Sequence, residues 1–206
     1  MKGKLDNLCI TYIDSEMKSG ATTARELAKR LRPGKQGPPS EISDWMRTHT
    51  DKDALVLCVD DFAGTGSTIS KGLRKFFDQK GIEEIRDIFL NEGRILCYLL
   101  YSFPEALDRL RTEYPKVKFL PINVFGDEVM ALDPNAGMFE NEDEINFARE
   151  MLIQIGRELD PQYPLGFGDI SALVCFNNTI PNNTLPIFWR SGTVNDKPWR
   201  ALFPRA

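Results

Sequence analysis

The most informative stretch of the chain is Leu55-Val56-Leu57-Cys58-Val59-Asp60-Asp61-Phe62-Ala63-Gly64-Thr65-Gly66-Ser67-Thr68. In it, an apolar run meets two adjacent carboxylates and then a short loop of small residues. Because the run is apolar throughout, we expect a strand over residues 54–59 that is covered on both faces, as in a parallel sheet. A helix is expected over residues 68–80, where apolar residues recur at helical spacing until Gly81 ends the pattern.

Strand and helix patterns alternate on both sides of this stretch. Apolar, β-branched runs predict further strands over residues 8–13, 95–101 and 117–124. A helical repeat predicts a helix over residues 22–31, and Ser102 is the expected N-cap of another helix that begins near Pro104. Residues 82–93 match either a short helix or a turn. The alternation as a whole predicts an α/β fold with a parallel, Rossmann-like sheet.

Residues 32–53 interrupt the alternation. They contain several Pro and Gly residues, so we expect little regular structure there beyond a short helix over residues 40–46. A segment of this length without regular structure is unusual inside a compact domain, and it is usually a functional loop or disordered.

The sequence changes character again at Phe125. From there we expect one helix over residues 143–159 and a Pro-, Gly- and Asn-rich tail with one strand over residues 172–176. The sequence therefore predicts two domains, an α/β core over residues 1–125 and an accessory region over residues 126–206 that packs on the core.

Composition excludes several classes of partner. The 206 residues carry a net charge of −4, which argues against bulk electrostatic attraction to nucleic acid or to an anionic membrane. No apolar run approaches the roughly 18–20 residues that a spanning helix needs, and the N-terminus carries no signal-peptide pattern. We therefore expect a cytoplasmic protein without a membrane partner.

The four cysteines lie far apart, each inside an apolar run, and no Cys-x-x-Cys pair occurs: Cys9, Cys58, Cys97 and Cys175. Buried, reduced thiols in strands explain this pattern better than a disulfide or a metal role. The single histidine, His49, argues against a zinc site.

The loop Ala63-Gly64-Thr65-Gly66-Ser67-Thr68 has the composition of a phosphate cradle. Small residues allow backbone N–H groups to approach an anion, and the N-terminus of the following helix favours negative charge. The three hydroxyl groups of the loop add donors. The loop lacks the Gly-Lys-Ser/Thr ending of a Walker loop, and it is not a dinucleotide fingerprint.

The carboxylates of Asp60 and Asp61 stand directly before this loop. Ligands of open α/β sheets bind beyond the carboxyl ends of the strands, which is where both residues are expected. Two carboxylates accept two ribose hydroxyls well, or they hold Mg²⁺. The pattern therefore predicts a ribose 5-phosphate ligand. The alternative is a strand end with an Asp turn and a Ser/Thr helix cap, without any ligand.

The run Val56–Thr68 resembles the phosphoribosyl-diphosphate (PRPP) motif of type I phosphoribosyltransferases. That motif has an apolar strand, two acidic residues, two or three small or apolar residues and then Thr-Gly-Gly/Ser-Thr. The resemblance implies that residues 63–68 bind the 5-phosphate. It implies that Asp60 and Asp61 meet the ribose hydroxyls, take part in binding Mg²⁺ and stabilise positive charge at the anomeric carbon. The implied reaction transfers a 5-phosphoribosyl group from PRPP to a nucleobase-like acceptor and releases pyrophosphate.

Two further segments stand where this family has functional loops. The pyrophosphate loop corresponds to residues 14–20, which implies that Ser19 and Gly20 bind pyrophosphate; a plain N-cap is the alternative. The mobile loop that closes over the reaction corresponds to residues 32–53. From it Lys35, Arg47 and His49 are candidates to reach pyrophosphate, and surface charge is the alternative for each.

The tail departs from the hoods that cover the nucleobase in purine, pyrimidine and orotate enzymes. Residues 166–169 and 177–186 instead resemble a divergent group of bacterial phosphoribosyltransferase-like proteins associated with defence systems. In a C-terminal hood over residues 126–206, Phe167 and Trp189 are candidates to line an acceptor pocket, and the asparagines of the tail are candidates to read the acceptor's edges. The alternative is turn chemistry with aromatic side chains in a core.

Three functions follow from the sequence. The first is a phosphoribosyltransferase that uses PRPP and Mg²⁺. The second is a non-catalytic regulator that senses PRPP or a nucleotide, and the third is a defence effector that acts on nucleotides or NAD. A homo-oligomer or a protein partner is compatible with all three.

Overall fold

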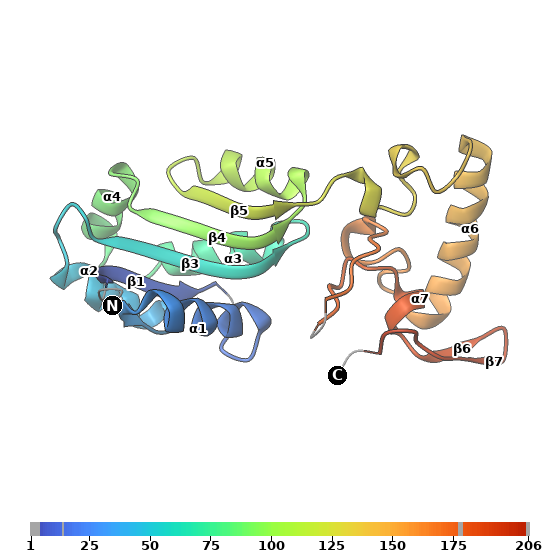
Figure 1. Ribbon diagram of the computed structural model, residues 1–206, viewed down its shortest axis with the longest axis horizontal. Coiled ribbons are helices and arrows are strands. Elements are labelled where there is room, and N and C mark those ends of the chain that lie inside the picture. Colours follow the sequence, from blue (N-terminus) through green and yellow to red (C-terminus); the bar gives the residue numbers. More distant parts are fainter. Residues whose placement is uncertain (1–4, 14, 177–178, 205–206) are drawn as a thin grey trace. The chain divides into compact units, whose positions relative to one another are not determined.

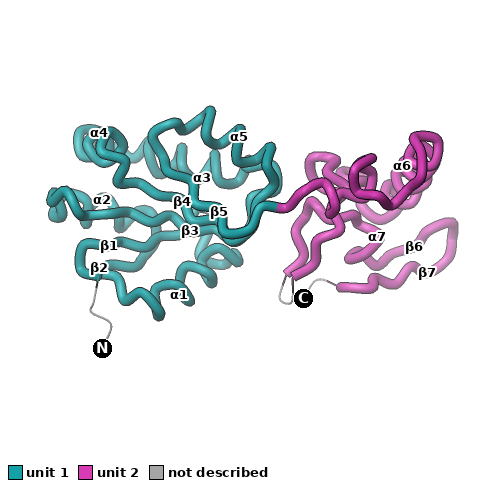
Figure 2. The backbone as a smooth tube through the Cα atoms, turned by 45° about the horizontal axis from the view of Figure 1, so that its top comes forward, with its two compact units in different colours: residues 1–124 teal, residues 125–206 magenta. Residues whose placement is uncertain are grey.

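The computed structural model describes residues 5–13, 15–176 and 179–204 (Figure 1). The chain divides into two compact units, Met1–Val124 and Phe125–Ala206 (Figure 2). The division falls where the alternation of strand and helix patterns ends in the sequence. Asp14, Asn177 and Asn178, which belong to segments with predicted binding roles, lie outside the described residues.

Unit 1 (residues 1–124) contains the sheet. Its strands are β1 (Leu5–Tyr12), β2 (Pro33–Gln36), β3 (Leu55–Ala63), β4 (Ile95–Ser102) and β5 (Lys118–Val124). Its helices are α1 (Ser19–Leu31), α2 (Pro39–Thr48), α3 (Ser67–Phe77), α4 (Glu83–Asn91) and α5 (Pro104–Glu113). All strand pairs are parallel and their order is β2-β1-β3-β4-β5, so the predicted Rossmann-like α/β fold is confirmed.

Strand β3 is central and is covered on both faces, as its continuous apolar run predicts. Its Leu57 and Val59 belong to a cluster with small residues of α1 on one face. Its Val56 and Cys58 face the opposite way, into a larger cluster to which α2, α3, α4 and α5 contribute. Because neighbouring side chains along a strand point to opposite faces, one apolar run supplies both cores.

The strand order creates a switch point between β1 and β3. The chain leaves β1 toward the β2 edge and then returns to build β3 on the other side of β1. The segments that follow β1 and β3 therefore diverge, and ligands of doubly wound sheets bind in the crevice at such a point.

The prediction of little regular structure over residues 32–53 is wrong at residues 33–36, whereas the short helix expected over residues 40–46 is confirmed as α2. Pro33–Gln36 form the edge strand β2, where a first-position Pro is tolerated because its missing N–H is not needed. Gly34 is required for this pairing, since a Cβ there would lie 2.0 Å from the Asp6 carbonyl oxygen. Pro39 then occupies the first turn of α2, which buries Ile42 and neighbouring apolar residues. The Pro and Gly residues are thus at edge and helix-start positions.

Other boundaries also differ from expectation. Residues 82–93 contain the helix α4, and β3 extends through both carboxylates to Ala63. Ser102 is the last residue of β4 and not a helix cap, because α5 begins after Phe103 without a side-chain cap. The Ser102 hydroxyl is fully buried and has no hydrogen-bond partner among the described residues.

Unit 2 (residues 125–206) has its own core. Its elements are η1 (Asp127–Val129), η2 (Pro134–Ala136), α6 (Glu142–Leu159), η3 (Phe167–Asp169), α7 (Pro186–Trp189), β6 (Gly192–Val194) and β7 (Lys197–Trp199). The predicted helix over residues 143–159 is confirmed as α6, whose first turn is capped by Asn141: its side-chain oxygen accepts from the Glu144 N–H at 3.0 Å. The strand predicted over residues 172–176 is wrong, because Ala172 forms only isolated bridges to Met130 and Thr184. In the described part of the chain, no helix has the length and apolarity needed to cross a bilayer.

Cysteine exposure gives a first testable prediction. All four thiols are free; Cys9, Cys58 and Cys97 are buried, as expected, whereas Cys175 is exposed and lies outside any strand. Burial raises the pKa of Cys9 and of Cys58 to about 12, which leaves almost no thiolate near neutral pH. We expect the native protein to release one equivalent of chromophore with a disulfide reagent quickly, and the denatured protein to release four. Rapid reaction of more than one thiol in the native state would contradict the buried positions.

Candidate functional site

The two carboxylates of the central stretch lie at the carboxyl end of β3, at the switch point. Asp60 is buried, with 7% of its surface exposed, and Asp61 is half-buried. The Asp61 N–H donates to the Asp60 Oδ1 at 2.9 Å, so the backbone orients the first carboxylate. A buried carboxylate at the carboxyl end of a strand in an open sheet is placed to receive a ligand's hydroxyl groups or a cation.

Gly20 of α1 lies directly against Asp60. A Cβ at Gly20 would stand 2.7 Å from the Asp60 Oδ1, closer than real Cβ contacts come. A Cβ at this position would therefore displace the Asp60 carboxylate, and glycine leaves the carboxylate in place beside the first turn of α1. The structure brings together Gly20 and Asp60, which the sequence assigned to two different loops.

The first turn of α1 begins without a side-chain cap from its N-cap residue. Ser19 is the first residue of the helix and Lys18 is the N-cap, whose side chain makes no capping hydrogen bond. The alternative of a plain Ser N-cap is therefore not what the structure has. Uncapped N–H groups at a helix start bind anions, since the helix dipole favours negative charge there.

The loop between β3 and α3 is shaped by its own hydroxyl groups. Thr65 Oγ1 donates to Ser67 Oγ at 3.0 Å, and the Ser67 N–H donates to Thr65 Oγ1 at 3.4 Å. Helix α3 begins at Ser67 with Gly66 as N-cap and without a side-chain cap among the described residues. Ala63 and Gly64 are buried beneath the loop, whereas Thr68 is exposed on the first turn. Residues 63–68, the predicted phosphate cradle, thus lead into a second helix start whose N-cap residue makes no side-chain cap.

Gly66 meets two separate constraints. Its φ of 74° lies in the left-handed region, which residues with a Cβ rarely adopt. A Cβ there would also lie 3.1 Å from Leu110 Cγ and 3.3 Å from the Ala106 carbonyl oxygen, both on α5. The tight turn and the close approach of α5 both require glycine at this position.

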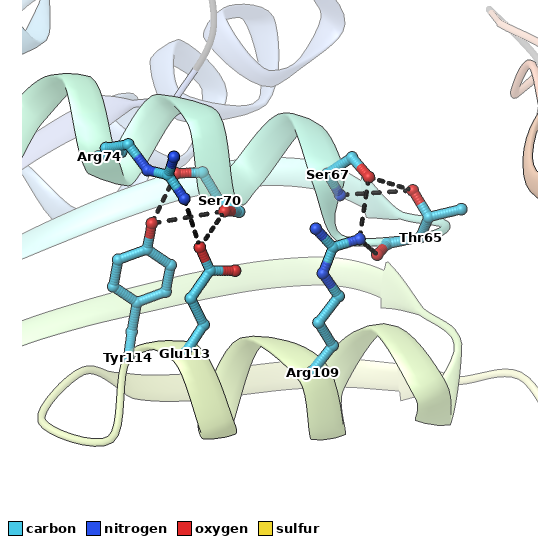
Figure 3. A network of polar contacts seen from close by, with 7 residues as sticks. All are labelled: Thr65, Ser67, Ser70, Arg74, Arg109, Glu113 and Tyr114. Atoms are coloured by element: carbon cyan, nitrogen blue, oxygen red, sulfur yellow. Dashed lines mark hydrogen bonds and ion pairs between the residues drawn. The ribbon is translucent and has the colours of Figure 1, made fainter.

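Arg109 of α5 is a site residue that the sequence does not reveal. Its Nη1 donates to Ser67 Oγ at 3.1 Å and to the Thr65 carbonyl oxygen at 3.4 Å (Figure 3). A guanidinium beside an open helix start is well suited to bind a phosphate oxygen. In the sequence, Arg109 looks like any exposed charge on an amphipathic helix, and no motif marks it.

A second polar cluster fixes α5 against α3. Glu113 Oε1 accepts from Ser70 Oγ at 2.7 Å and from Arg74 Nη2 at 3.0 Å, and the Tyr114 hydroxyl donates to the Ser70 carbonyl oxygen at 2.8 Å (Figure 3). The Ser70 hydroxyl first, and then Arg74, lower the pKa of Glu113. Because the fold lowers the pKa of Glu113, its ionised carboxylate stabilises the protein at pH values above the ordinary carboxyl pKa. This stabilisation is lost as the pH falls through the lowered pKa. At neutral pH the cluster therefore links the end of α5 to α3.

The aspartate pair is a fitting but small metal site. Within the described residues, no group of three or more metal-ligating side chains occurs. Mg²⁺ prefers oxygen ligands, and it often takes only one or two carboxylates together with substrate phosphates and water. Asp60 and Asp61 supply the right donors, so they suit Mg²⁺ that arrives with a phosphorylated ligand and not a metal that the protein holds alone.

The basic residues expected on a closing loop are held by neighbours within unit 1. Lys35 Nζ lies 2.6 Å from Glu41 Oε2, and Arg47 donates to the Gly81 carbonyl oxygen at 2.8 Å. His49 stacks on Trp45 with ring centroids 4.4 Å apart. These contacts match the alternative of structural surface charge.

The two aromatic candidates for the acceptor pocket differ in exposure. Trp189 is buried and its indole N–H donates to the Thr184 carbonyl oxygen at 2.9 Å, as in a core aromatic. Phe167 is half-buried, and its ring meets Tyr163 edge to face at 5.0 Å. The Asn183 side chain donates to the Phe167 carbonyl oxygen at 2.8 Å, which is turn chemistry. Of the two, Phe167 is the more exposed.

Comparison with known proteins identifies one family. The family model PRTase-CE matches residues 1–205. No curated protein matches the sequence. Among solved structures, the AQ2163 protein from Aquifex aeolicus is similar with 15% sequence identity and a TM-score of 0.38. The match covers 58% of this chain and 55% of that one, so the chain spans about half the length of the similar structure.

Proposed function

The chain belongs to the PRTase-CE family, which is phosphoribosyltransferase-like, and on that premise we propose that it binds PRPP together with Mg²⁺. We further propose that it transfers the 5-phosphoribosyl group to a nucleobase-like acceptor. In this reaction the bond from the anomeric carbon to the pyrophosphate oxygen breaks. Pyrophosphate leaves with the electron pair, and the acceptor's nitrogen forms the new bond.

The observation that carries the proposal is the contact of Gly20 with Asp60. This contact places the uncapped start of α1 beside Asp60 at the end of β3. The loop that follows β3 leads directly to the uncapped start of α3. PRPP has a phosphate at one end, a diphosphate at the other and two hydroxyls between them. An anion site on each side of two carboxylates supports this order of groups.

Each group of the site then has a distinct task. The loop over residues 63–68 and Arg109 hold the 5-phosphate through N–H, hydroxyl and guanidinium donors. Asp60 and Asp61 accept hydrogen bonds from the ribose hydroxyls and stabilise positive charge that develops at the anomeric carbon. Ser19 and Gly20 offer backbone N–H groups to the pyrophosphate as it leaves. When bound, Mg²⁺ would offset the charge of the diphosphate.

Acceptor recognition is assigned to unit 2. The half-buried ring of Phe167 suits stacking on a flat acceptor. Trp189 is buried, so it would support the proposed acceptor-binding region from the core of unit 2.

Calorimetric titration of the full chain with PRPP tests the proposal. We expect saturable binding in the presence of Mg²⁺ and weaker binding in its absence. Ribose 5-phosphate should bind more weakly than PRPP, because it lacks the diphosphate. The absence of PRPP binding at millimolar concentration, with Mg²⁺ present and the protein folded, would overturn the proposal.

A non-catalytic PRPP sensor is the second candidate, and one observation favours it. Residues 33–48 form β2 and α2, where the family's mobile closing loop was expected. A site without a closing loop leaves water access to the anomeric carbon, which favours binding over transfer. Phosphorus NMR of the protein with PRPP and a panel of nucleobases separates the two candidate functions. A transferase releases pyrophosphate, whereas a sensor binds PRPP without releasing pyrophosphate. The predicted role in defence stays a prediction.

Arg109→Met tests the guanidinium's role in phosphate binding. Loss of one charge-assisted contact at an exposed site should weaken PRPP binding by about tenfold. Titration calorimetry measures the change, and Arg111→Met on the same helix is the matched control. Tighter binding by Arg109→Met would show that the guanidinium blocks the loop, and the assigned role would then be wrong.

A further inference from the structure

A cavity of about 690 Å³ lies beside the candidate site, between the end of β1, the start of α2 and one side of α3. Its walls include Thr68, the last residue of the predicted phosphate cradle. Asp60, Asp61 and Gly20 do not line it, whereas Ser15 and Glu16 of the segment matched to the pyrophosphate loop do. Its volume is in the range of small-molecule pockets, roughly 300–1,000 Å³.

Positive charge dominates the cavity's wall. Lys71 and Lys75 line it from α3, and they share a helix face with Thr68 because the three are spaced by three and four residues. Among the described residues neither lysine forms an ion pair. Glu16 is the one acidic residue in the described lining, and its Oε1 lies 3.5 Å from Arg25 Nη2. Two ammonium groups a helical turn apart, without carboxylate partners among the residues that the structure describes, attract an anion.

The remaining wall combines hydroxyl groups with apolar surfaces. Ser15 and Ser40 join Thr68 as hydrogen-bond donors. Pro38 and Pro39, which are half-buried, provide flat, apolar contact area. Such a lining accepts a ligand that has an anionic end and an apolar or aromatic body.

The close packing of α3 fixes one side of the cavity. A Cβ at Gly72 would stand 2.4 Å from Ile13 Cγ2 and 2.5 Å from the Ile13 carbonyl oxygen. Glycine at this position lets α3 lie directly on the end of β1. The cavity's lysines are therefore presented from a helix that is in contact with the sheet.

We propose that this cavity is a second binding site, and that its ligand is a nucleotide: a molecule with phosphate groups for Lys71 and Lys75 and a ring for the apolar wall. The phosphates contact the two ammonium groups and the hydroxyl of Thr68. The ring lies against Pro38 and Pro39. The site shares Thr68 with the proposed phosphate cradle, but its charged groups, Lys71 and Lys75, are not those of the carboxylate crevice.

Titration of the full chain with ADP tests the site, with adenosine and inorganic pyrophosphate as comparison probes. We expect ADP to bind, pyrophosphate to bind more weakly and adenosine to bind weakest. Lys71→Met/Lys75→Met should weaken ADP binding by at least about tenfold, because two charged contacts are lost. Lys52→Met/Lys197→Met makes the same change in net charge at exposed positions outside the cavity, and it should bind ADP like the wild type.

A third variant separates the two sites. Asp60→Asn/Asp61→Asn should keep its ADP affinity, even if PRPP proves not to be a ligand. The proposal is overturned if the wild type does not bind ADP at millimolar concentration, or if adenosine binds as tightly as ADP. It is also overturned if ADP binding survives Lys71→Met/Lys75→Met, or if it is lost in the aspartate variant.

Discussion

Asp60→Asn/Asp61→Asn is expected to abolish measurable PRPP binding while the protein stays folded. Each carboxylate contributes charge-assisted hydrogen bonds or a metal contact, so the pair should account for about a hundredfold or more in affinity. Asparagine keeps the Oδ1 that accepts from the residue 61 N–H, so the strand end retains its local hydrogen bond. Removing the charge of Asp60 also relieves a repulsion that helps to raise the pKa of the buried Cys97 thiol.

Titration calorimetry of the double variant and thermal unfolding followed by circular dichroism check this expectation together. Asp78→Asn/Asp108→Asn, at two exposed positions of unit 1, is the control for the change in net charge. Wild-type PRPP affinity in Asp60→Asn/Asp61→Asn would remove the carboxylates from the ligand. If the double variant is unfolded, the single variant Asp61→Asn tests the expectation instead, because the Asp61 side chain is less buried than that of Asp60.

Gly66→Ala should have the largest effect on stability, and it should also weaken PRPP binding. The left-handed φ and the overlap with α5 together should cost about 2–4 kcal/mol. For a protein of this size, that corresponds to a fall in Tm of roughly 5–10 °C. Any shift of the loop that relieves the overlap also moves the N–H groups of the cradle, so PRPP affinity should fall with stability.

Gly137→Ala is the matched control for this substitution. Gly137 has a similar φ of 66°, but a Cβ there would meet nothing within 4 Å. The difference in stability loss between the two variants therefore measures the energetic cost of the contact with α5, separately from the cost of the left-handed backbone conformation. Equal losses of stability would mean that the contact with Leu110 and Ala106 is easily relieved.

The core of the fold was predictable because its signals are strong and local. The run Leu55–Val59 is apolar at every position, and only a strand covered on both faces explains that composition. The stripe of Ile69, Leu73 and Phe76 has helical spacing and is buried along α3 as expected. In both cases the pattern depends on neighbouring residues and not on distant ones.

The edge strand β2 was missed because its residues are typical of turns. Pro33 and Gly34 disfavour a strand in isolation, and the tertiary pairing with β1 overrides that preference at the sheet edge. The Ser102 error has a related cause. Serine before Pro is a common helix start, but pairing with β3 extends β4 to include Ser102.

The candidate site was only partly predictable for a similar reason. Its carboxylates and loop follow one another in sequence, so a contiguous pattern reveals them. Arg109 reaches the loop only because of how α5 is rotated on α3, and this rotation depends on contacts such as that of Leu110 with Gly66. The lysine-lined cavity is formed by three segments that are separate in sequence, so no single pattern indicates it.

Helix α3 carries Ser67 in the cradle and Lys71 and Lys75 in the cavity, and Gly72 brings it into contact with the end of β1. Occupants of the two places would thus meet along one helix, with Thr68 between them. If a bound nucleotide changes the affinity for PRPP by some factor, thermodynamic reciprocity requires that bound PRPP change the affinity for the nucleotide by the same factor. A helix that lies directly on the sheet in this way would let the supply of one metabolite set the protein's response to another.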